Sequence, residues 1–207
     1  MEYGSFAPIV RSVCALFLLQ SLGSGVRAES GARQADAEAA LLHRRIDLSG
    51  IQQWERSAAS WQPLTLTPAK IYVVNLWSVY CPPCQKEFPL LRNLMKGWRG
   101  HPEVQFLFVA DPPSDASAEE VAAFWQKNQA ALPDTGPLRT VSAMLRQSIE
   151  NDQNPITLLL DENLIVRQAF VGSIETRPIG RSIERLMQTS NHSFGIGKKP
   201  RLSVLHR

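Results

Sequence analysis

Cysteine is scarce in this sequence of 207 residues, and that scarcity excludes one class of protein at once. Only Cys14, Cys81 and Cys84 are present, too few for a domain held together by several disulfide bonds. The four histidines are scattered, and no two have the close spacing typical of a zinc site. We therefore expect no metal at the cysteine pair, since a zinc site would need about two more soft ligands.

Charge and long apolar runs are also in short supply. The net charge of +3 at pH 7 is too small to indicate nucleic-acid binding, and much of it lies in residues 191–207. We expect that segment to be a disordered basic tail. The apolar run near the N-terminus, Val13–Leu19, is well short of the ~20 residues that span a bilayer.

The N-terminal segment has the parts of a secretory signal peptide. Arg11 precedes the apolar run, and Val26–Ala28 offers small or apolar residues at the positions that a signal peptidase recognises. We expect residues 1–28 to be removed on export; an uncleaved anchor or a buried helix is the alternative. Cleavage would remove Cys14 and leave the two later cysteines alone in an oxidising compartment.

Four segments are predicted to be strands. Ile71–Trp77, Val104–Ala110 and Pro155–Leu160 are nearly continuous in apolarity, which is typical of strands buried on both faces. Leu164–Val171 follows the third strand after an Asp-Glu-Asn turn, so we expect the two to form a hairpin.

Four helices are predicted between and after these strands. Pro82 and Pro83 can begin the first, because the first helical turn makes no internal use of its N–H groups; Pro89 should kink it. A capping-box pattern from Ser117 predicts the second helix. The last two helices are predicted over Leu138–Ile149 and Arg177–Met187.

The order of elements predicts an α/β domain. We expect a charged, alanine-rich extension over residues 29–45, a single domain over 46–190, and the tail thereafter. Within the domain, Ile46–Thr67 should be mixed, because prolines interrupt regular structure there. Alternating strands and helices that end in a hairpin and a helix predict a central mixed sheet with helices on both faces.

The two remaining cysteines lie in the stretch WSVYCPPCQKEFP, Trp77–Pro89. A disulfide between them would close a loop of two residues, which restricts the unfolded chain too little to be a useful staple. Cys81 lies where a strand leads into a helix N-terminus, a position that stabilises a thiolate. We therefore interpret Cys81 as a nucleophile and Cys84, one turn later, as the resolving thiol.

This stretch resembles the active site of the thioredoxin fold, and is most similar to its secreted bacterial TlpA-like branch. The resemblance covers roughly Ile46–Gln188, and Pro89 matches the proline found inside the family's active-site helix. It implies a thioredoxin-like fold and a redox-active Cys81–Cys84 disulfide.

The resemblance also implies roles for residues outside the cysteine pair. Pro155 matches the family's cis-proline, which presents backbone to the substrate and keeps metal from the thiols; an ordinary trans proline is the alternative. Asn154 departs from the apolar residue or threonine usual before that proline. Glu87 matches a glutamate that would transfer the proton of Cys84; otherwise it is an exposed first-turn acid favoured by the helix dipole.

The remaining site residues surround the cysteines in sequence. Asn75 stands where cytoplasmic thioredoxins have a buried aspartate, and it cannot titrate. Trp77 and Tyr80, with Pro82 and Pro83, are predicted to form the substrate-binding surface beside the disulfide. The alternative, that the two aromatic residues belong to the core, has more support for Trp77 than for Tyr80.

Together these features predict a periplasmic protein-disulfide oxidoreductase. The resemblance implies a reductant, for example in cytochrome c maturation, without a bound organic cofactor. Its partners would be protein thiols or disulfides and a membrane electron donor that regenerates it; we expect a monomer. The alternative is a thioredoxin-fold factor that delivers copper or assembles a respiratory complex.

Overall fold

The computed structural model describes residues 31–111, 117–130, 132, 136–140, 144–149, 154–172 and 176–193. The predicted signal peptide and residues 194–207 of the predicted tail lie outside these residues. The chain divides into two compact units, Met1–Ala40 and Leu41–Arg207, and a helix covers residues 31–41. None of the described helices combines the length and apolarity needed to cross a membrane.

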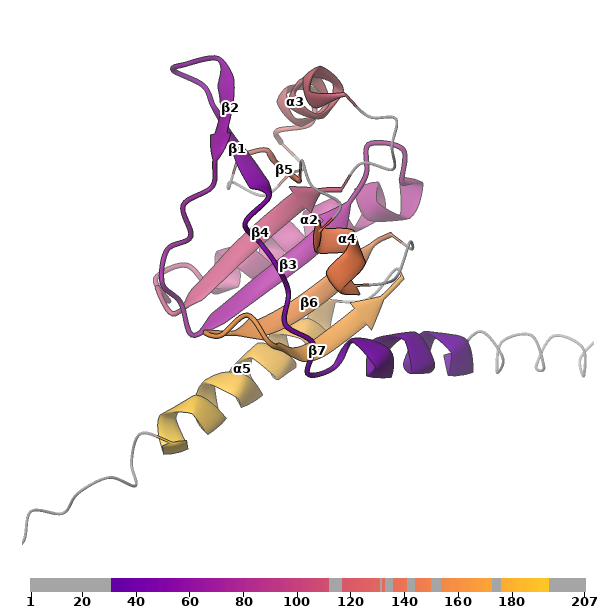
Figure 1. Cartoon of the computed structure of the whole chain (residues 1–207), viewed down its shortest axis with the longest axis vertical. Coiled ribbons are helices and arrows are strands. Elements are labelled where there is room, and N and C mark those ends of the chain that lie inside the picture. The colour runs from indigo at the N-terminus through magenta and orange to yellow at the C-terminus, as the bar shows by residue number, and fades with distance from the viewer. Residues whose placement is uncertain are drawn as a thin grey trace, which may run out of the picture. The chain divides into compact units, whose positions relative to one another are not determined.

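The second unit is built on one mixed sheet of seven strands, in the order β2-β1-β5-β4-β3-β6-β7 (Figure 1). The strands are β1 (Ile51–Glu55), β2 (Ser60–Pro63), β3 (Ile71–Trp77), β4 (Val104–Ala110), β5 (Leu138–Thr140), β6 (Ile156–Asp161) and β7 (Val166–Val171). β3 pairs in parallel with β4 and antiparallel with β6, which continues into the hairpin with β7. Every residue of β3 is buried, as its continuous apolarity predicts.

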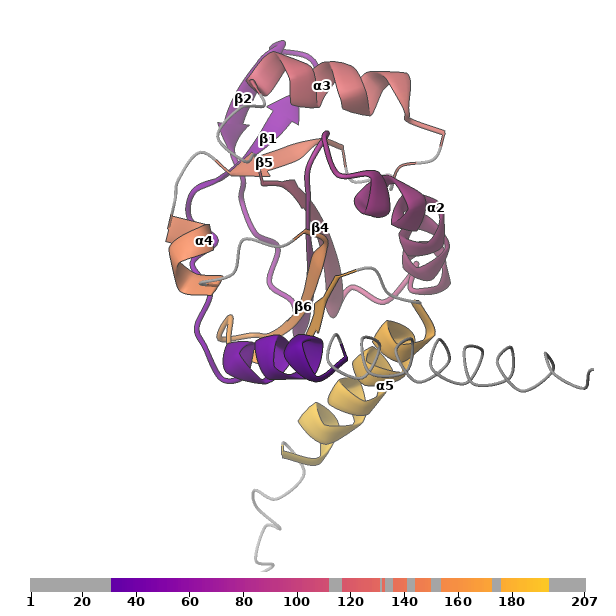
Figure 2. The same ribbon diagram turned by 90° about the vertical axis from the view of Figure 1, so that its right-hand side faces the viewer.

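Helices lie on both faces of this sheet. They are α2 (Pro82–Gly97), α3 (Ala118–Lys127), α4 (Met144–Ile149) and α5 (Thr176–Ser193). Figure 2 shows α2 and α5 together on one side of the sheet and α4 on the other. The predicted fold class is confirmed, and so is the capping box, in which Ser117 and Glu120 bond to each other's backbone N–H.

The structure adds a hairpin that the sequence did not predict and corrects the bounds of one predicted helix. The mixed segment before β3 contains the β1–β2 hairpin, in which Trp54 faces Trp61 directly with ring centroids 5.5 Å apart. Such a cross-strand aromatic pair stabilises a hairpin whose local sequence is weakly strand-like. The helix predicted over 138–149 begins only at Met144, because Leu138–Thr140 pair with β1 and β4 instead.

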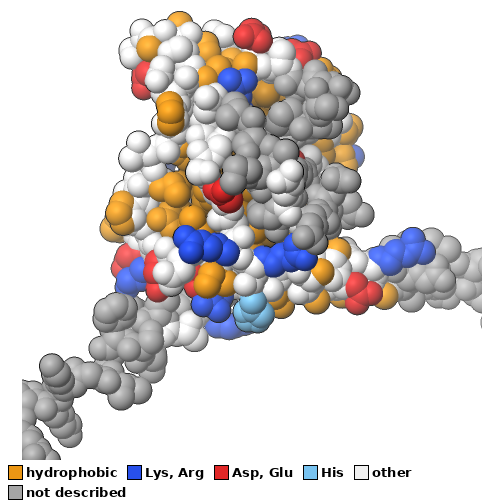
Figure 3. Space-filling model, viewed as in Figure 1, with side chains coloured by type: hydrophobic (Ala, Val, Ile, Leu, Met, Phe, Trp, Pro, Cys, Tyr) orange, Lys and Arg blue, Asp and Glu red, His pale blue; other side chains and the backbone are white. Residues whose placement is uncertain are grey.

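The surface below the hairpin carries exposed apolar side chains, as Figure 3 shows from the same side as Figure 1. Hydrophobic residues are buried on both faces of the sheet, and one cluster lies on the face that α2 and α5 cover. There, alternate residues of β3 and β4, among them Val73, Trp77 and Phe108, pack against Phe88 and Leu91 of α2.

Candidate active site

A disulfide joins Cys81 and Cys84 where the β3–α2 loop meets the helix. The S–S distance is 2.00 Å and the two Cα atoms are 5.3 Å apart. Cys81 is the N-cap of α2, and its backbone N–H donates to the Ser78 carbonyl at 3.1 Å. Pro82 and Pro83 occupy the first two helical positions, where their missing N–H groups cost the helix nothing.

The two cysteines differ in exposure and in electrostatic environment. Cys81 is 8% exposed and Cys84 only 1%, so an incoming molecule meets the first sulfur. The backbone N–H of Cys84 donates to the Cys81 sulfur at 3.1 Å. A backbone N–H donor of this kind and the positive end of a helix both stabilise a thiolate at the N-cap. The arrangement thus favours attack by Cys81 and resolution by Cys84.

Trp77 is a core residue, so its prediction as part of the substrate-binding surface is wrong. Its side chain is completely buried. The ring packs edge-on against Phe88 of α2, with centroids 5.2 Å apart, and lies 5.5 Å from Phe124 and 6.0 Å from Trp125 of α3. Trp77 lies under the cysteine loop and joins both helices to the sheet.

Tyr80 lies at the rim of the site and is 57% exposed. Its hydroxyl donates to Glu120 Oε1 at 2.7 Å, while Glu120 Oε2 accepts the Ser117 backbone N–H at 2.7 Å. Both donors hold the pKa of Glu120 below its usual value, and the Ser117 N–H has a larger effect than the Tyr80 hydroxyl. The bond connects the residue before Cys81 to the first turn of α3. The capping box gave the only sequence signal for Glu120, and nothing predicted its bond to Tyr80.

Polar side chains are buried on β3 and α2, the two elements that the cysteine loop joins. Asn75 of β3 is buried, and its Nδ2 donates to Thr157 Oγ1 of β6 at 2.9 Å. Glu87 is 2% exposed on the same inner face of α2 as Cys84, so it is not an exposed first-turn acid. Because side chains three apart on a helix are neighbours, Glu87 follows Cys84 on the same buried face of α2.

Pro155 and Asn154 are brought to the same end of the sheet as the disulfide. Leu76 pairs with Ile156, so Pro155 lies opposite the last residue of β3. The Asn154–Pro155 peptide bond is cis, and the Pro155 carbonyl accepts the Gly172 N–H at 2.8 Å. Pro155 is buried and Asn154 half-buried.

Asp111 is a residue of this end of the sheet that the sequence analysis treated only as part of a turn. It follows β4, is 2% exposed, and its backbone N–H donates to the Trp77 carbonyl at 2.8 Å. An acidic residue directly after a buried strand was the available signal. Among the described residues, no three His, Cys, Asp or Glu side chains are grouped so that they could hold a metal ion.

The sheet topology and the CxxC disulfide at a strand-to-helix junction are those of the thioredoxin-like fold. The chain matches no family model. It is 24% identical over 119 residues to the thioredoxin-like protein YneN of Bacillus subtilis, a stretch covering 56% of this chain and 64% of the relative. The match therefore spans less than two thirds of that protein's length.

Solved structures share the same fold at low sequence identity. A putative thiol:disulfide interchange protein DsbE from Chlorobium tepidum superposes with a TM-score of 0.52 at 15% identity, covering 72% of this chain and 98% of its own. The exposed lipoprotein thioredoxin of Streptococcus pneumoniae gives a TM-score of 0.50 at 16% identity, over 65% and 97% of the two chains. These similarities show the thioredoxin-like fold.

Proposed function

We propose that this protein exchanges disulfides with partner proteins through Cys81 and Cys84. The observation that carries the proposal is the unequal environment of the pair: the more exposed sulfur lies at the N-cap of α2 and the buried one a turn behind it. No organic cofactor is required, because the cysteine pair itself stores two electrons as two thiols.

The exchange proceeds in two displacements. In the reduced protein, the Cys81 thiolate attacks a substrate disulfide, forms a mixed disulfide and expels one substrate thiolate, which takes up a proton. The Cys84 thiolate then attacks the Cys81 sulfur, which restores the Cys81–Cys84 bond and releases the second substrate thiol. The substrate gains the two electrons that the protein loses, and a partner must return two electrons before the next cycle.

Glu87 would hold the proton that Cys84 must lose. Its carboxyl group is buried, one helical turn after Cys84, and is separated from bulk water on the inner face of α2. A buried carboxyl exchanges protons with adjacent groups, and Cys84 is the adjacent group that has to titrate. Asn75 cannot take this role, because an amide does not ionise.

The substrate chain would dock across the disulfide, between two groups of residues that lie on either side of it. Tyr80, Pro82 and Pro83 are exposed on one side, and the register of β3 and β6 brings Asn154 and Pro155 to the other. In this arrangement an extended substrate segment would run past Asn154 and Pro155 while Cys81 attacks its disulfide. Trp77 takes part only by supporting the loop.

Direction and location are further parts of the proposal. We propose an exported reductant, periplasmic in a two-membrane cell, working as a monomer and regenerated by a membrane electron donor. The signal-like residues 1–28 support export, and two proteins with this fold are described as an interchange protein DsbE and an exposed lipoprotein. Cytochrome c maturation is one pathway that consumes such reducing power.

A redox titration tests the proposed function. The fraction of Cys81–Cys84 disulfide would be measured by thiol alkylation and mass spectrometry in dithiothreitol and glutathione buffers. A reductant should equilibrate near the potential of thioredoxin, about −270 mV, whereas a value near −120 mV would make it an oxidant. Reduction of insulin should be lost in Cys81→Ser. Tight copper(I) binding without insulin reduction would instead identify a copper-delivery protein.

A further inference from the structure

The central strand β4 is paired unevenly on its two edges. β3 accompanies it over its whole length, from Val104 to Ala110. On the other edge, β5 meets it only at Val109 and Ala110. Within the described part of the chain, the first five residues of β4 therefore have no partner strand on that edge. Unpaired strand edges of this kind accept a further strand unless something covers them.

The direction of the hydrogen bonds shows which backbone groups are left. Ile71 N–H donates to the Glu103 carbonyl, and Asp111 N–H donates to the Trp77 carbonyl. In a parallel ladder alternate residues bond to the same neighbour, so the odd-numbered residues of β4 face β3. Phe106 therefore directs its N–H and C=O away from β3, toward the edge on which β5 pairs only with Val109 and Ala110.

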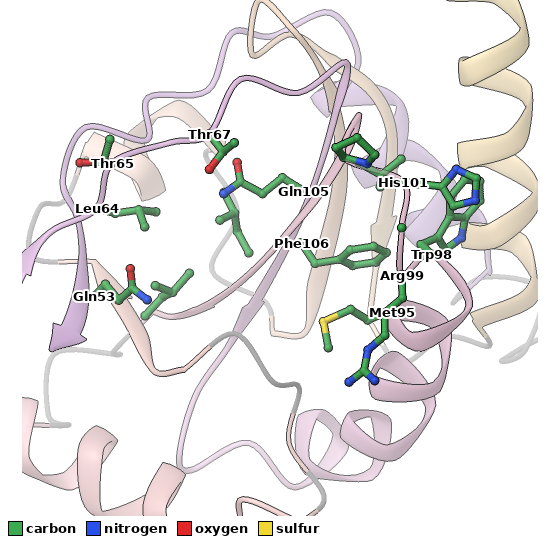
Figure 4. Close-up of a pocket in the computed structure, with 15 residues that line it drawn as sticks. Gln53, Leu64, Thr65, Thr67, Met95, Trp98, Arg99, His101, Gln105 and Phe106 are labelled. Atoms are coloured by element: carbon green, nitrogen blue, oxygen red, sulfur yellow. The ribbon is translucent and has the colours of Figure 1, made fainter. Parts of the chain in front are cut away.

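A groove of about 570 Å³ lies along this unpaired edge (Figure 4). Residues 104–107 of β4 form one wall, and Leu64, Thr65 and Thr67 of the segment after β2 form the opposite wall. Figure 4 shows Met95 and Trp98 at the α2 end of the groove. The space is comparable to that of small-ligand sites and is long enough for a few extended residues.

The groove is lined by basic residues and not by acidic ones. Arg99 and His101 are among the described residues that line it, and no Asp or Glu is. The wall also includes the Gln105 carboxamide, whose Oε1 is buried and accepts no hydrogen bond within the described residues. A ligand that supplies N–H donors and a carboxylate would therefore be complementary to this surface.

We propose that the groove binds an extended, acidic peptide segment of a partner protein, which adds a short strand to the outer edge of β4. The outward N–H and C=O of Phe106 would pair with the peptide backbone, as in other proteins that bind peptides by strand addition. An acidic side chain of the peptide would lie near Arg99. An apolar side chain on the opposite face would contact Leu64.

This site is separate from the disulfide. The cysteines follow the carboxyl end of β3, and the groove begins at the amino end of the parallel strand β4, about 20 Å away along the strand. The groove would thus bind a partner without blocking Cys81. Peptide binding and disulfide exchange can each fail while the other persists, so the two proposals are tested independently.

Backbone pairing can be detected directly by NMR. The full chain labelled with ¹⁵N would be titrated with acetyl-Thr-Val-Glu-Val-Glu-Val-Thr-amide, with the same peptide carrying Lys in place of Glu, and with the Glu peptide N-methylated at its central valine. The Glu peptide should shift the Phe106 amide saturably and slow its hydrogen exchange. The Lys peptide and the N-methylated peptide should each bind about tenfold more weakly.

Substitutions in and away from the groove would show where the peptide binds. Arg99→Glu should weaken the Glu peptide about tenfold and favour the Lys peptide, while Lys86→Glu, the same charge change at an exposed site on α2, should leave both affinities unchanged. Thr65→Trp should fill the groove and abolish binding. Disulfide exchange should persist in all three variants.

Three results would overturn the proposal. The first is an unshifted Phe106 amide at millimolar Glu peptide. The second is equal binding of the Glu, Lys and N-methylated peptides. The third is a set of shifted amides centred on Tyr80 and Cys81, which would place the peptide at the disulfide instead.

Discussion

Two glutamates flank the disulfide, and they have opposite environments. Glu87, on the inner face of α2, is 2% exposed, whereas Glu120, in the first turn of α3, is exposed. Glu120 accepts hydrogen bonds from Ser117 and Tyr80, which lower its pKa and keep it charged. Glu87 lies beside Cys84 and away from water.

The difference shows how one residue type can serve two purposes at one site. A solvated carboxylate with fixed donors is a structural acceptor, and here it joins the loop before Cys81 to α3. A buried carboxyl beside a thiol is placed to exchange a proton with it. We therefore expect substitutions of Glu87 to affect chemistry and substitutions around Glu120 to affect stability. The predictions below test this division.

The largest effect is expected where both helices meet the sheet. Trp77→Ala removes a buried ring that contacts α2 and α3 together, and should lower the free energy of unfolding by about 3–5 kcal/mol. Urea denaturation measures this. Leu90→Ala, at a 45% exposed position of α2, is the control and should change little. Equal effects of the two substitutions would contradict the supporting role of Trp77.

Glu87→Gln should alter the chemistry while the fold persists. Replacing the Glu87 carboxyl by an amide removes the group that would take up the proton of Cys84, so the pH midpoint of thiol alkylation in the reduced protein should shift by on the order of one pH unit. Glu120→Gln is the matched control and should leave the midpoint unchanged. An unaltered alkylation curve for Glu87→Gln would remove Glu87 from the mechanism.

Ser117→Ala should act on stability alone. The Ser117 hydroxyl caps α3 by accepting the Glu120 N–H at 3.2 Å, and loss of an N-cap costs about 1 kcal/mol. Thermal or urea unfolding would show the loss, with the rate of insulin reduction unchanged. A stability equal to that of the unmodified protein would mean that α3 is held by Phe124 and Trp125 without its cap.

Glu120→Gln should give the smallest effect, and one that depends on pH. Because the folded-state pKa of Glu120 lies below the usual value of 4.5, its charge stabilises the fold above that pH. The contribution is lost as pH falls through the lowered pKa, where the group is protonated in both states. Unfolding curves of the two proteins should therefore differ at pH 7 and converge in acid. A difference that is constant with pH would contradict the ionic role.

Local sequence predicted the elements whose residues are buried on both faces. The boundaries predicted for β3 and β4 match, because a run such as IYVVNLW has no polar face that would permit another structure. The elements that depend on distant partners were missed. Leu138–Thr140 is extended because it pairs with β1 on one side and β4 on the other. The local sequence does not indicate these partners.

The site was predictable in its cysteines and less so in its surroundings. Motif spacing located Cys81 and Cys84 at the start of α2, where the structure has them joined. Motif spacing does not show how deeply a side chain is buried. Trp77 was therefore predicted to lie on the substrate-binding surface, although it is fully buried. For Glu87, an exposed position was left open as an alternative, and the residue is in fact buried. Depth depends on how α2 and α3 pack on the sheet, which sequence spacing does not specify.

The central claim is that Cys81 attacks and Cys84 resolves, and one measurement tests it most directly. Reduced Cys84→Ser and Cys81→Ser proteins would each be mixed with a peptide disulfide, and the mixed disulfide followed by mass spectrometry. Cys84→Ser should accumulate a stable adduct at Cys81, on the order of a hundredfold faster than Cys81→Ser forms one at Cys84. Equal rates, or an adduct only at Cys84, would contradict the account.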